Sequence, residues 1–470
     1  MKRLIYFMLL IVAVMITSCK ESFFDINTDP NNPATATPKW ILPSGIAGSC
    51  YVIGGYYQNL GGFWSQHYAQ ATSASQWLQL EMFNLDESDF DRQFNSLYNG
   101  PLMDFESIKK TTLASKDWSY YTIATLMQSY TFEVLADLYD QIPFSESLQG
   151  LEKLSPKYEK GIDIYDSLIH RINFAINQNL TANTVSKVGT EDLIFSGDMD
   201  KWIQFANTLK LKMYLRFVNI DANKYKAEIQ ALLTENNFLL TPACMTAFKD
   251  EENGRNPFYE TFMDRLAGNV AASKTLIDTL INTADPRLTA IFIPAEASGI
   301  EVGIGQGRYK EDQSKYANYK NLSTPNVTGL SPVYLFTVPE VYFLIAEAEL
   351  RYGSAANAET NYISGINASF DMLHVTQTPS MYNTPSSAYY YNGLYSIMLQ
   401  KWIAAANTTA IESFFDKNRT GYPSNFVASP VSVLTPGATP QRLLFPETER
   451  KSNPNTPKRV NLDTKVWFTK

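Results

Sequence analysis

Hydrophobic side chains recur at helical spacing in several long segments, and this pattern constrains the fold more than any other feature. In the segment 198–217, apolar residues fall at offsets of 3, 4, 7 and 11 from the first, on one face of a helix: Trp202, Phe205, Ala206, Leu209 and Met213. Asp198 or Asp200 can cap the start of this helix. We expect Lys212 and Arg216 on its wetter side.

Other segments repeat this period, so the chain is expected to be mostly α-helical. The stretch "PEVYFLIAEAELRYG" reads as a helix opened by Pro339, with Glu340 in its first turn. Three more segments follow the helical period: 120–139, 158–176 and 395–415. Strand-like alternation is short and falls around Phe292 and Tyr334. Three looser stretches read as long excursions from one body: 293–330, 376–392 and 422–440.

Small residues and aromatic residues alternate at a spacing typical of tetratricopeptide helix pairs. Ala358, Tyr362 and Gly365 lie 12, 16 and 19 positions after Ala346. In such a pair the small residues let two helices approach, and the aromatic ring fills the gap. The second-helix part of the pattern recurs at Gly161, Tyr165 and Leu168. Unrelated amphipathic helices would give a similar pattern, so both interpretations stay open.

The N-terminus carries the signals of an exported protein. Lys2 and Arg3 precede an apolar run over residues 4–16, which is too short to span a bilayer but suits a signal peptide. The run ends in Ile-Thr-Ser-Cys, which resembles a bacterial lipobox with Cys19 as the lipidated residue. An ordinary secretory signal with an incidental cysteine is the alternative. Several acyl chains on Cys19 would anchor the mature chain firmly to a membrane without spanning it.

Processing at Cys19 divides the chain into three parts. We expect residues 1–18 to be a removed lipoprotein signal peptide, residues 19–38 a lipidated tether and leading turn, and residues 39–470 a single domain. Loss of the two basic residues changes the formal net charge from −8 to −10. So acidic a chain is a poor partner for nucleic acid or anionic lipid. Cys50 and Cys244 could pair, but we expect two buried free thiols because a chain of this length needs no disulfide.

Several longer motifs occur in an order that identifies a family. They are "FFDINTDPNNP", "DLIFSGDMDKWIQFANTLKLKMYLRF", "VPEVYFLIAEAELRYG", "LQKWIAAANTTAIESFFDKNRTGYP", "RLLFPETERKSNPN" and the terminal "KVWFTK". Together they resemble the SusD/RagB family of Bacteroidota outer-membrane lipoproteins, in its SusD-like branch, from Cys19 to Lys470. The resemblance implies four tetratricopeptide-like helix pairs that support an irregular helix and loop half, where the ligand binds.

The resemblance also implies a location and a partner. Such a protein is lipid-anchored in the outer membrane, faces the cell exterior, and captures nutrient oligosaccharides for a TonB-dependent, SusC-like transporter barrel. Lys20-Glu21 resembles a brief export tag for the cell surface. The RagB side of the family suggests a peptide-binding lid as an alternative. Two other classes stay open: a surface glycoside hydrolase and a structural or adhesive surface protein.

The Asp-rich stretch after the lipobox does not predict a metal site. Asp25 to Asp29 has the D-x-N-x-D start of a calcium loop. An EF-hand needs Gly at the sixth position and Glu at the twelfth. This chain has Pro30 and Ala36 there, so a turn of Asn, Asp and Pro explains the stretch. We expect no metal and no cofactor.

No catalytic motif is found, so we do not expect an enzyme. The histidines lack the contexts of zinc hydrolases: His67, His170 and His374. A glycosidase needs two facing carboxylates, which sequence alone does not exclude. The candidate pairs are Glu347 with Glu349 and Asp137 with Asp140. They lie on or at the end of predicted helices, so we expect them to have structural roles. The Gly-x-Gly-x-Gly run at residues 303–307 lacks nucleotide-binding spacing and reads as a flexible loop.

The aromatic residues of the chain indicate ligand binding rather than catalysis. Sugar rings present flat C–H faces that pack on aromatic rings, while polar side chains bind the hydroxyls at the rim. Trp77 follows small polar residues, so we expect it in a loop with its indole facing solvent. The run from Tyr389 to Tyr395 reads as the start of a helix against the core, and Tyr316 and Tyr319 follow the glycine run. The predicted ligand residues are Trp77, Tyr68, Trp64, Asn84, Arg308 and Tyr309.

Overall fold

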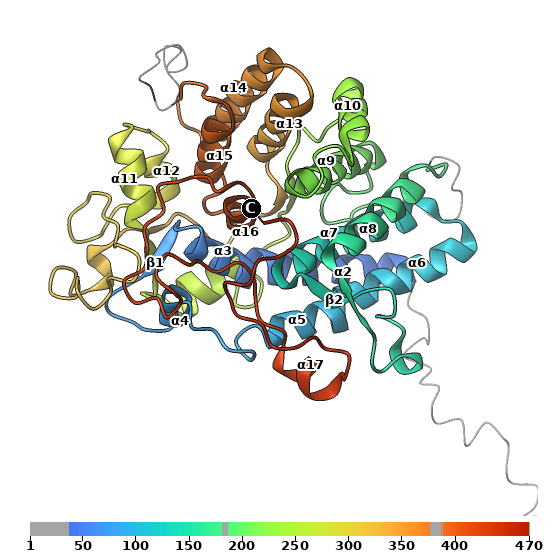
Figure 1. Ribbon diagram of the computed structural model, residues 1–470, viewed down its shortest axis with the longest axis horizontal. Helices are drawn as coiled ribbons and strands as arrows, with labels where there is room; N and C mark the ends of the chain where they lie inside the picture. The colour runs from blue at the N-terminus through green and yellow to red at the C-terminus, as the bar shows by residue number, and fades with distance from the viewer. Residues whose placement is uncertain (1–36, 181–186, 377–386, 388, 470) are drawn as a thin grey trace, which may run out of the picture.

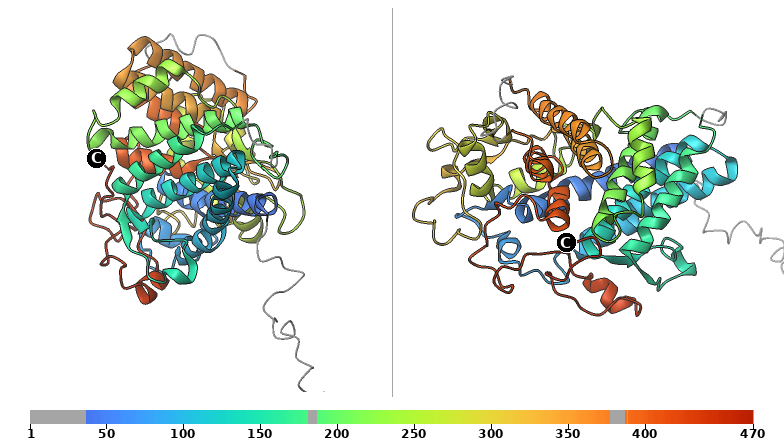
Figure 2. Two further views of the ribbon diagram at one scale, coloured as in Figure 1. Left: turned by 90° about the vertical axis from the view of Figure 1, so that its right-hand side faces the viewer. Right: turned by 45° about the horizontal axis from the view of Figure 1, so that its top comes forward.

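The amphipathic segments of the sequence form helices that stack into an arc (Figure 1). The computed structural model describes residues 37–180, 187–376, 387 and 389–469. The predicted lipid attachment site Cys19 and the Asp25–Asp29 stretch lie outside these residues. In Figure 1 the arc runs from α6 to α8 at the right, past α9 and α10, to α13, α14 and α15 at the top. Figure 2, left, shows these helices one above another.

The described residues form the following elements. The longer helices are α2 (Pro38–Tyr51), α6 (Met103–Ser115), α7 (Trp118–Tyr139), α8 (Gly161–Ile176), α9 (Met199–Arg216), α10 (Lys226–Glu235), α13 (Val338–Tyr352), α14 (Ala355–Met372), α15 (Gly393–Ala404) and α16 (Ala410–Thr420). The other α-helices are α3 (Gln58–Trp64), α4 (Leu78–Met82), α5 (Asp91–Leu97), α11 (Lys274–Asn282), α12 (Leu288–Ile291) and α17 (Glu447–Ser452). The π-helices are η2 (Val52–Tyr57), η3 (Tyr98–Leu102) and η6 (Tyr259–Arg265), and the 3₁₀ turns are η4 (Gly150–Glu152), η5 (Phe217–Asn219) and η7 (Tyr319–Asn321).

Strands are short, and each described sheet has two antiparallel strands. The pairs are β1 (Tyr68–Gln70) with β5 (Val270–Ala272), β2 (Gln141–Pro143) with β3 (Tyr158–Lys160), β4 (Ala243–Met245) with β8 (Val333–Phe336), and β6 (Phe292–Ile293) with β7 (Thr324–Pro325). Strands therefore do occur at Phe292 and Tyr334, as the sequence predicts. We call α6–α10 with α13–α16 the helical half. Residues 66–90, 246–332 and 421–446, where α-helices are few and short, are the loop half.

The cap predicted for α9 is present, whereas two predicted helices differ: the segment 158–176 begins with strand β3, and α8 starts only at Gly161. Asp198 caps α9, because its carboxylate accepts the backbone N–H of Lys201 at 3.2 Å. The predicted helix over 395–415 is instead divided into α15 and α16. Asn407 lies between them with φ 64°, and its amide donates to the Ile291 carbonyl at 2.6 Å. This distant contact, which periodicity along the chain does not register, turns the backbone between the two helices.

The predicted small-residue contact joins α13 to α14. A Cβ atom on Gly365 would lie 2.7 Å from the ring of Phe343, so a larger residue would push the helices apart. Ala346, Ala358 and Tyr362 are wholly buried near this contact. The two helices therefore approach closely at the small residues, as expected, while the tetratricopeptide-like character of the pair stays a prediction. The count of four tetratricopeptide-like pairs stays a prediction.

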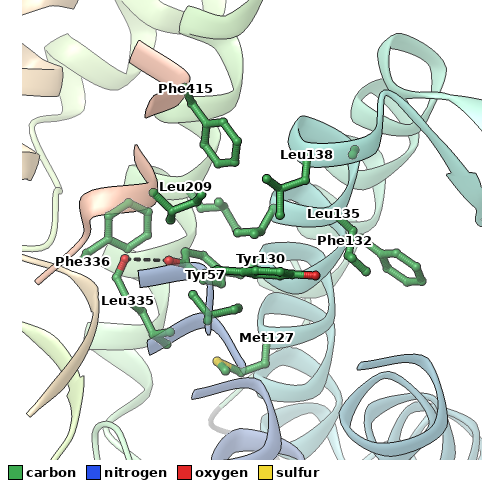
Figure 3. Close-up of a cluster of buried hydrophobic side chains, with 14 of the residues drawn as sticks. Tyr57, Met127, Tyr130, Phe132, Leu135, Leu138, Leu209, Leu335, Phe336 and Phe415 are labelled. Carbon is green, nitrogen blue, oxygen red and sulfur yellow. Dashed lines mark hydrogen bonds between the residues drawn. The ribbon is translucent and has the colours of Figure 1, made fainter. Parts of the chain in front are cut away.

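The hydrophobic core joins the two ends of the described chain, because one buried cluster includes both Leu42 and Phe468. Figure 3 shows part of it, where Tyr130 of α7, Leu209 of α9 and Phe415 of α16 come together. The Tyr130 hydroxyl donates to the Leu335 carbonyl of β8 at 3.0 Å. This bond satisfies a polar group that burial would otherwise leave unpaired.

Lys212 and Arg216 are buried, so the prediction that they lie on the wetter side of α9 is wrong. The Lys212 ammonium lies 2.9 Å from carboxylate oxygens of both Glu133 and Glu412. The Arg216 guanidinium lies 2.9 Å from Asp137 and 2.8 Å from Glu412. The reason for the error is that α9 packs between α7 and α16, which cover its polar face with acidic side chains.

These ion pairs form a buried network through the helical half. Arg419 pairs with Glu347 at 2.6 Å, and Lys401 pairs with Asp416 at 2.7 Å, which brings α13 and α15 into the network. Burial raises the pKa of Glu133, although Lys212 opposes the shift. Replacing one of these charged residues by an apolar residue would leave a buried charge with less counter-charge, which is destabilising.

Cys50 and Cys244 are both free thiols. Cys50 is buried, and burial raises the pKa of its thiol to about 12. Cys244 is half-buried, which is less than expected. Within the part of the chain that the structure describes, no helix is both long enough and apolar enough to cross a bilayer.

Candidate ligand-binding site

Trp77 is held in a turn before α4 by hydrogen bonds to buried side chains. Its backbone N–H donates to Gln70 Oε1 at 2.7 Å, and the preceding N–H of Gln76 donates to Asn269 Oδ1 at 3.0 Å. Gln70 in turn donates from Nε2 to the Asn269 carbonyl at 3.2 Å. Because Gln70 and Asn269 are buried, the turn has a fixed position on the loop half.

The indole of Trp77 is half-buried, and this corrects the expectation that it faces solvent. Its ring lies 5.2 Å from the ring of Phe262, which belongs to η6. Its Nε1 atom is buried without a hydrogen-bond partner among the described residues. The local sequence offers no apolar face for Trp77, but a segment about 185 positions away along the chain provides one.

Glu81 connects the Trp77 turn (residues 71–82) to the Arg308 segment (residues 303–319). Its two carboxyl oxygens accept the backbone N–H groups of Gln70 at 2.7 Å and Gly307 at 3.0 Å. Burial raises the pKa of the Glu81 carboxyl to about 8, while the two N–H donors partly oppose that shift. The structure thus places the Trp77 turn and the Arg308 segment next to each other.

The glycine run at 303–307 is buried, so the prediction of a flexible loop is wrong. Gly307 has φ 70°, a conformation that L side chains rarely adopt, and a Cβ atom there would overlap Ser429. Gly303 approaches the backbone of Lys274 so closely that a Cβ would lie 2.8 Å away. The glycines therefore serve close packing and fix the start of the Arg308 segment.

Arg308 and Asn84 are exposed, whereas Tyr309 is mostly covered. The Arg308 guanidinium lies 2.8 Å from Glu311 and 3.6 Å from Asp312. Exposed ion pairs of this kind are weak, so these donors can be redirected to a ligand at small cost. The Thr72 hydroxyl donates to the carbonyl of Tyr316, which is a second link between the two segments.

Tyr68 does not face a ligand, because it is wholly buried in β1. Its hydroxyl donates to Asn407 Oδ1 at 2.8 Å and accepts from Gln58 Nε2 at 3.2 Å. Trp64 is also nearly covered, and its Nε1 donates to the Leu80 carbonyl at 3.2 Å. Trp64 also lines a cavity, which the sequence did not predict.

This cavity has a volume of about 430 Å³ and lies under the segment 426–440. Trp64, Phe83 and Phe414 line it on the side of the helices, and the ring of Trp64 lies 5.0 Å from that of Phe414. Lys417 supplies a cation to its wall. In the sequence, the prolines, serines and threonines of residues 426–440 indicate a loop. They do not indicate that a cavity lies beneath it.

Comparison with known proteins identifies the family. A family model described as starch-binding, associating with the outer membrane, matches residues 30–446. The chain belongs to the SusD-like family. No curated protein matches it.

Solved structures of SusD homologs show the same fold. A SusD homolog from Bacteroides uniformis is 21% identical with a TM-score of 0.78, covering 92% of this chain and 99% of its own. A chitin-binding SusD homolog from Flavobacterium johnsoniae is 19% identical with a TM-score of 0.77, covering 91% and 98%. One from Parabacteroides distasonis is 23% identical with a TM-score of 0.75, covering 93% and 98%.

The two carboxylate pairs considered from the sequence are engaged in internal contacts in this SusD-like chain. Glu347 pairs with Arg419, and Asp137 pairs with Arg216. Their neighbours accept backbone N–H groups: Glu349 from Ser354 at 3.0 Å, and Asp140 from Trp467 at 2.8 Å. Neither pair is therefore available to attack or protonate a glycosidic bond.

The histidine nearest the Trp77 turn also has a structural role. His67 is wholly buried, its Nε2 lies 2.9 Å from the Trp402 carbonyl, and its ring stacks on that of Trp402 at 5.4 Å. Burial lowers the pKa of His67 to about 3, so the side chain stays neutral at physiological pH. Among the residues that the structure describes, no three His, Cys, Asp or Glu side chains are grouped to hold a metal ion.

Proposed function

We propose that this chain captures oligosaccharides at the cell surface and delivers them unchanged to a TonB-dependent, SusC-like transporter. The family match over residues 30–446, described as starch-binding and associating with the outer membrane, is the observation that carries the proposal. The fold shared with a chitin-binding SusD homolog supports it. In this proposal residues 39–470 act as one ligand-binding domain.

The ligand would lie across the Trp77 turn and the Arg308 segment. The exposed part of the Trp77 indole offers a flat apolar face for the C–H groups of a sugar ring. Arg308 offers hydrogen-bond donors at the rim, and the Asn84 amide offers both donor and acceptor. The Glu81 bridge between the two segments means that they need little ordering when a ligand binds.

Titration calorimetry of the whole chain in detergent with maltoheptaose and chitohexaose tests ligand capture. We expect saturable binding of at least one sugar, and mass spectrometry should show that sugar intact afterwards. Cleavage products that scale with protein concentration would instead indicate a glycoside hydrolase. Binding of peptides together with no binding of either sugar would favour the RagB-like alternative.

The lipid anchor is part of the same proposal. Residues 1–18 would be removed, and the acylated Cys19 would hold the chain on the outer membrane through the tether to residue 38. The Cys19→Ala variant should lose incorporation of labelled palmitate and leave the membrane fraction, because no acyl chain remains. A Cys50→Ala variant is the matched control and should stay lipidated. Labelled, membrane-bound Cys19→Ala protein would contradict the anchor.

A further inference from the structure

A groove lies between α11 and α15, away from the Trp77 turn. It has a volume of about 600 Å³, within the usual range for ligand sites. In Figure 1, α11 and α15 stand in the upper left part of the molecule, while α4, which begins after Trp77, lies at the lower left. Among the described residues that line it none is charged, and several carry hydroxyls or amides, including Thr279, Asn282, Thr283, Asn392, Ser396 and Asn425.

Two tyrosine rings on the groove are left open to solvent. Tyr390 is 41% exposed and Tyr395 is 39% exposed. Their neighbour Tyr389 is buried, so only part of this aromatic run belongs to the core, contrary to the sequence prediction. Tyr395 is held from one side by the ring of Tyr422, at 5.7 Å and nearly perpendicular. Its orientation is therefore fixed while one side remains free to stack.

Amide and hydroxyl groups surround these rings. The Asn425 amide donates to the Thr279 hydroxyl at 2.9 Å, which ties the segment 421–446 to α11. Asn282 and Asn392 are exposed on the two facing sides of the groove. An amide offers a donor and an acceptor side by side, which matches the paired hydroxyls of a sugar.

The walls of the groove are rigid. Leu276 and Leu280 of α11 and Leu399 and Trp402 of α15 belong to one buried apolar cluster. Below them, the buried Arg287 donates to Gln400 of α15 at 2.7 Å and to Asp285 at 2.6 Å. Because both helices are fixed against each other, a ligand would meet a preformed site.

We propose that this groove is a second carbohydrate site, one that takes a neutral oligosaccharide. Stacking on Tyr390 and Tyr395 would supply affinity, and Asn282, Asn392 and Asn425 would bind hydroxyl groups. A charged sugar or a peptide terminus would find no ion-pair partner among the described residues that line the groove. The assignment rests on the proposed function only for the class of ligand, because the site is built from different residues.

The number of sugar-binding sites per chain tests whether the groove binds sugar. Calorimetry of the whole chain with maltoheptaose and chitohexaose should give two sites per chain for at least one sugar. In the Tyr390→Ala/Tyr395→Ala variant the groove should lose at least about thirtyfold in affinity, which leaves one measurable site. The Tyr390→Phe/Tyr395→Phe variant keeps the rings and should keep both sites. Tyr51→Ala, at another exposed tyrosine, should also keep both.

The outcomes separate this inference from the proposed function. If the alanine variant misfolds, Asn282→Ala at an exposed position gives a second test and should weaken the groove severalfold. Suppose that the wild type has one site, which survives in the double alanine variant and in Asn282→Ala but disappears in Trp77→Ala. That result would overturn the proposal for the groove and leave the proposed function standing. Binding of neither sugar to the wild type would overturn both. Retention of two unaltered sites in the alanine variant would place the second site elsewhere.

Discussion

Lys212 in the helical half and Arg308 in the loop half each contact two carboxylates, yet their surroundings are opposite. Lys212 is wholly buried between Glu133 and Glu412, whereas Arg308 is about half exposed beside Glu311. A buried pair is costly to break, because the partner is left charged without water, while an exposed pair exchanges readily with solvent or ligand. At these two positions the helical half uses charge to fix its helices and the loop half keeps charge available, although the loop half also holds the buried pair of Arg287 with Asp285.

The largest expected effect comes from breaking the buried network. Arg216→Met should lower the free energy of unfolding by about 3–5 kcal/mol, because Asp137 loses its cation and Glu412 keeps only Lys212. Arg308→Met is the matched control and should cost less than about 1 kcal/mol. Urea unfolding followed by circular dichroism measures both. Equal losses for the two variants would mean that burial does not distinguish the two halves.

A pH series sharpens the comparison within the loop half. The pKa of Glu81 is raised to about 8 by burial, so the folded state keeps a proton that the unfolded chain releases near its ordinary value of 4.5. Stability from this group is therefore complete below pH 4.5 and falls as pH rises toward 8, by on the order of 1 kcal/mol per pH unit.

Glu81→Gln should remove that contribution to the slope, as measured by urea unfolding at each pH. Its absolute stability should also drop, because an amide has one acceptor oxygen for the two N–H donors. Glu251→Gln, at an exposed carboxylate, is the control and should retain the slope of the wild type. A slope unchanged in Glu81→Gln would show that the carboxyl is not the group that titrates.

A smaller effect on stability is expected at Trp77, which contributes both to packing and to the proposed ligand site. Trp77→Ala should cost about 2 kcal/mol of stability, less than a fully buried Trp, because the ring is only half-buried against Phe262. It should also lower sugar affinity about thirtyfold, which calorimetry measures. Trp40→Ala, at a tryptophan that is 74% exposed on α2, should change neither quantity. Normal sugar binding by folded Trp77→Ala protein would place the site elsewhere.

Local signals in the sequence were sufficient for much of the helical half. The boundary of α9 follows from Asp198, and the contact of α13 with α14 follows from small residues such as Gly365, because caps and helix faces are encoded over a few residues. The burial of Lys212 and Arg216 could not be predicted in this way. Their partners lie on α7 and α16, and the latter is about 200 positions away in the sequence.

The loop half was predicted less well, because its contacts are almost all distant. The sequence correctly placed Trp77 in a loop, but it did not reveal that Phe262 covers the indole or that Tyr68 is buried beneath Asn407. The 430 Å³ cavity and the groove with Tyr390 and Tyr395 have walls from separate segments. No periodic pattern along a single segment marks such a surface.

Hydrogen–deuterium exchange of the whole chain, with and without the sugar that binds it, tests most directly the claim that a fixed helical half supports a ligand-binding loop half. The account predicts added protection at the Trp77 turn (residues 71–82) and the Arg308 segment (residues 303–319), with α7, α9 and α16 unchanged because they are already protected. Added protection confined to α7, α9 and α16, with none in those two segments at saturating sugar, would contradict it.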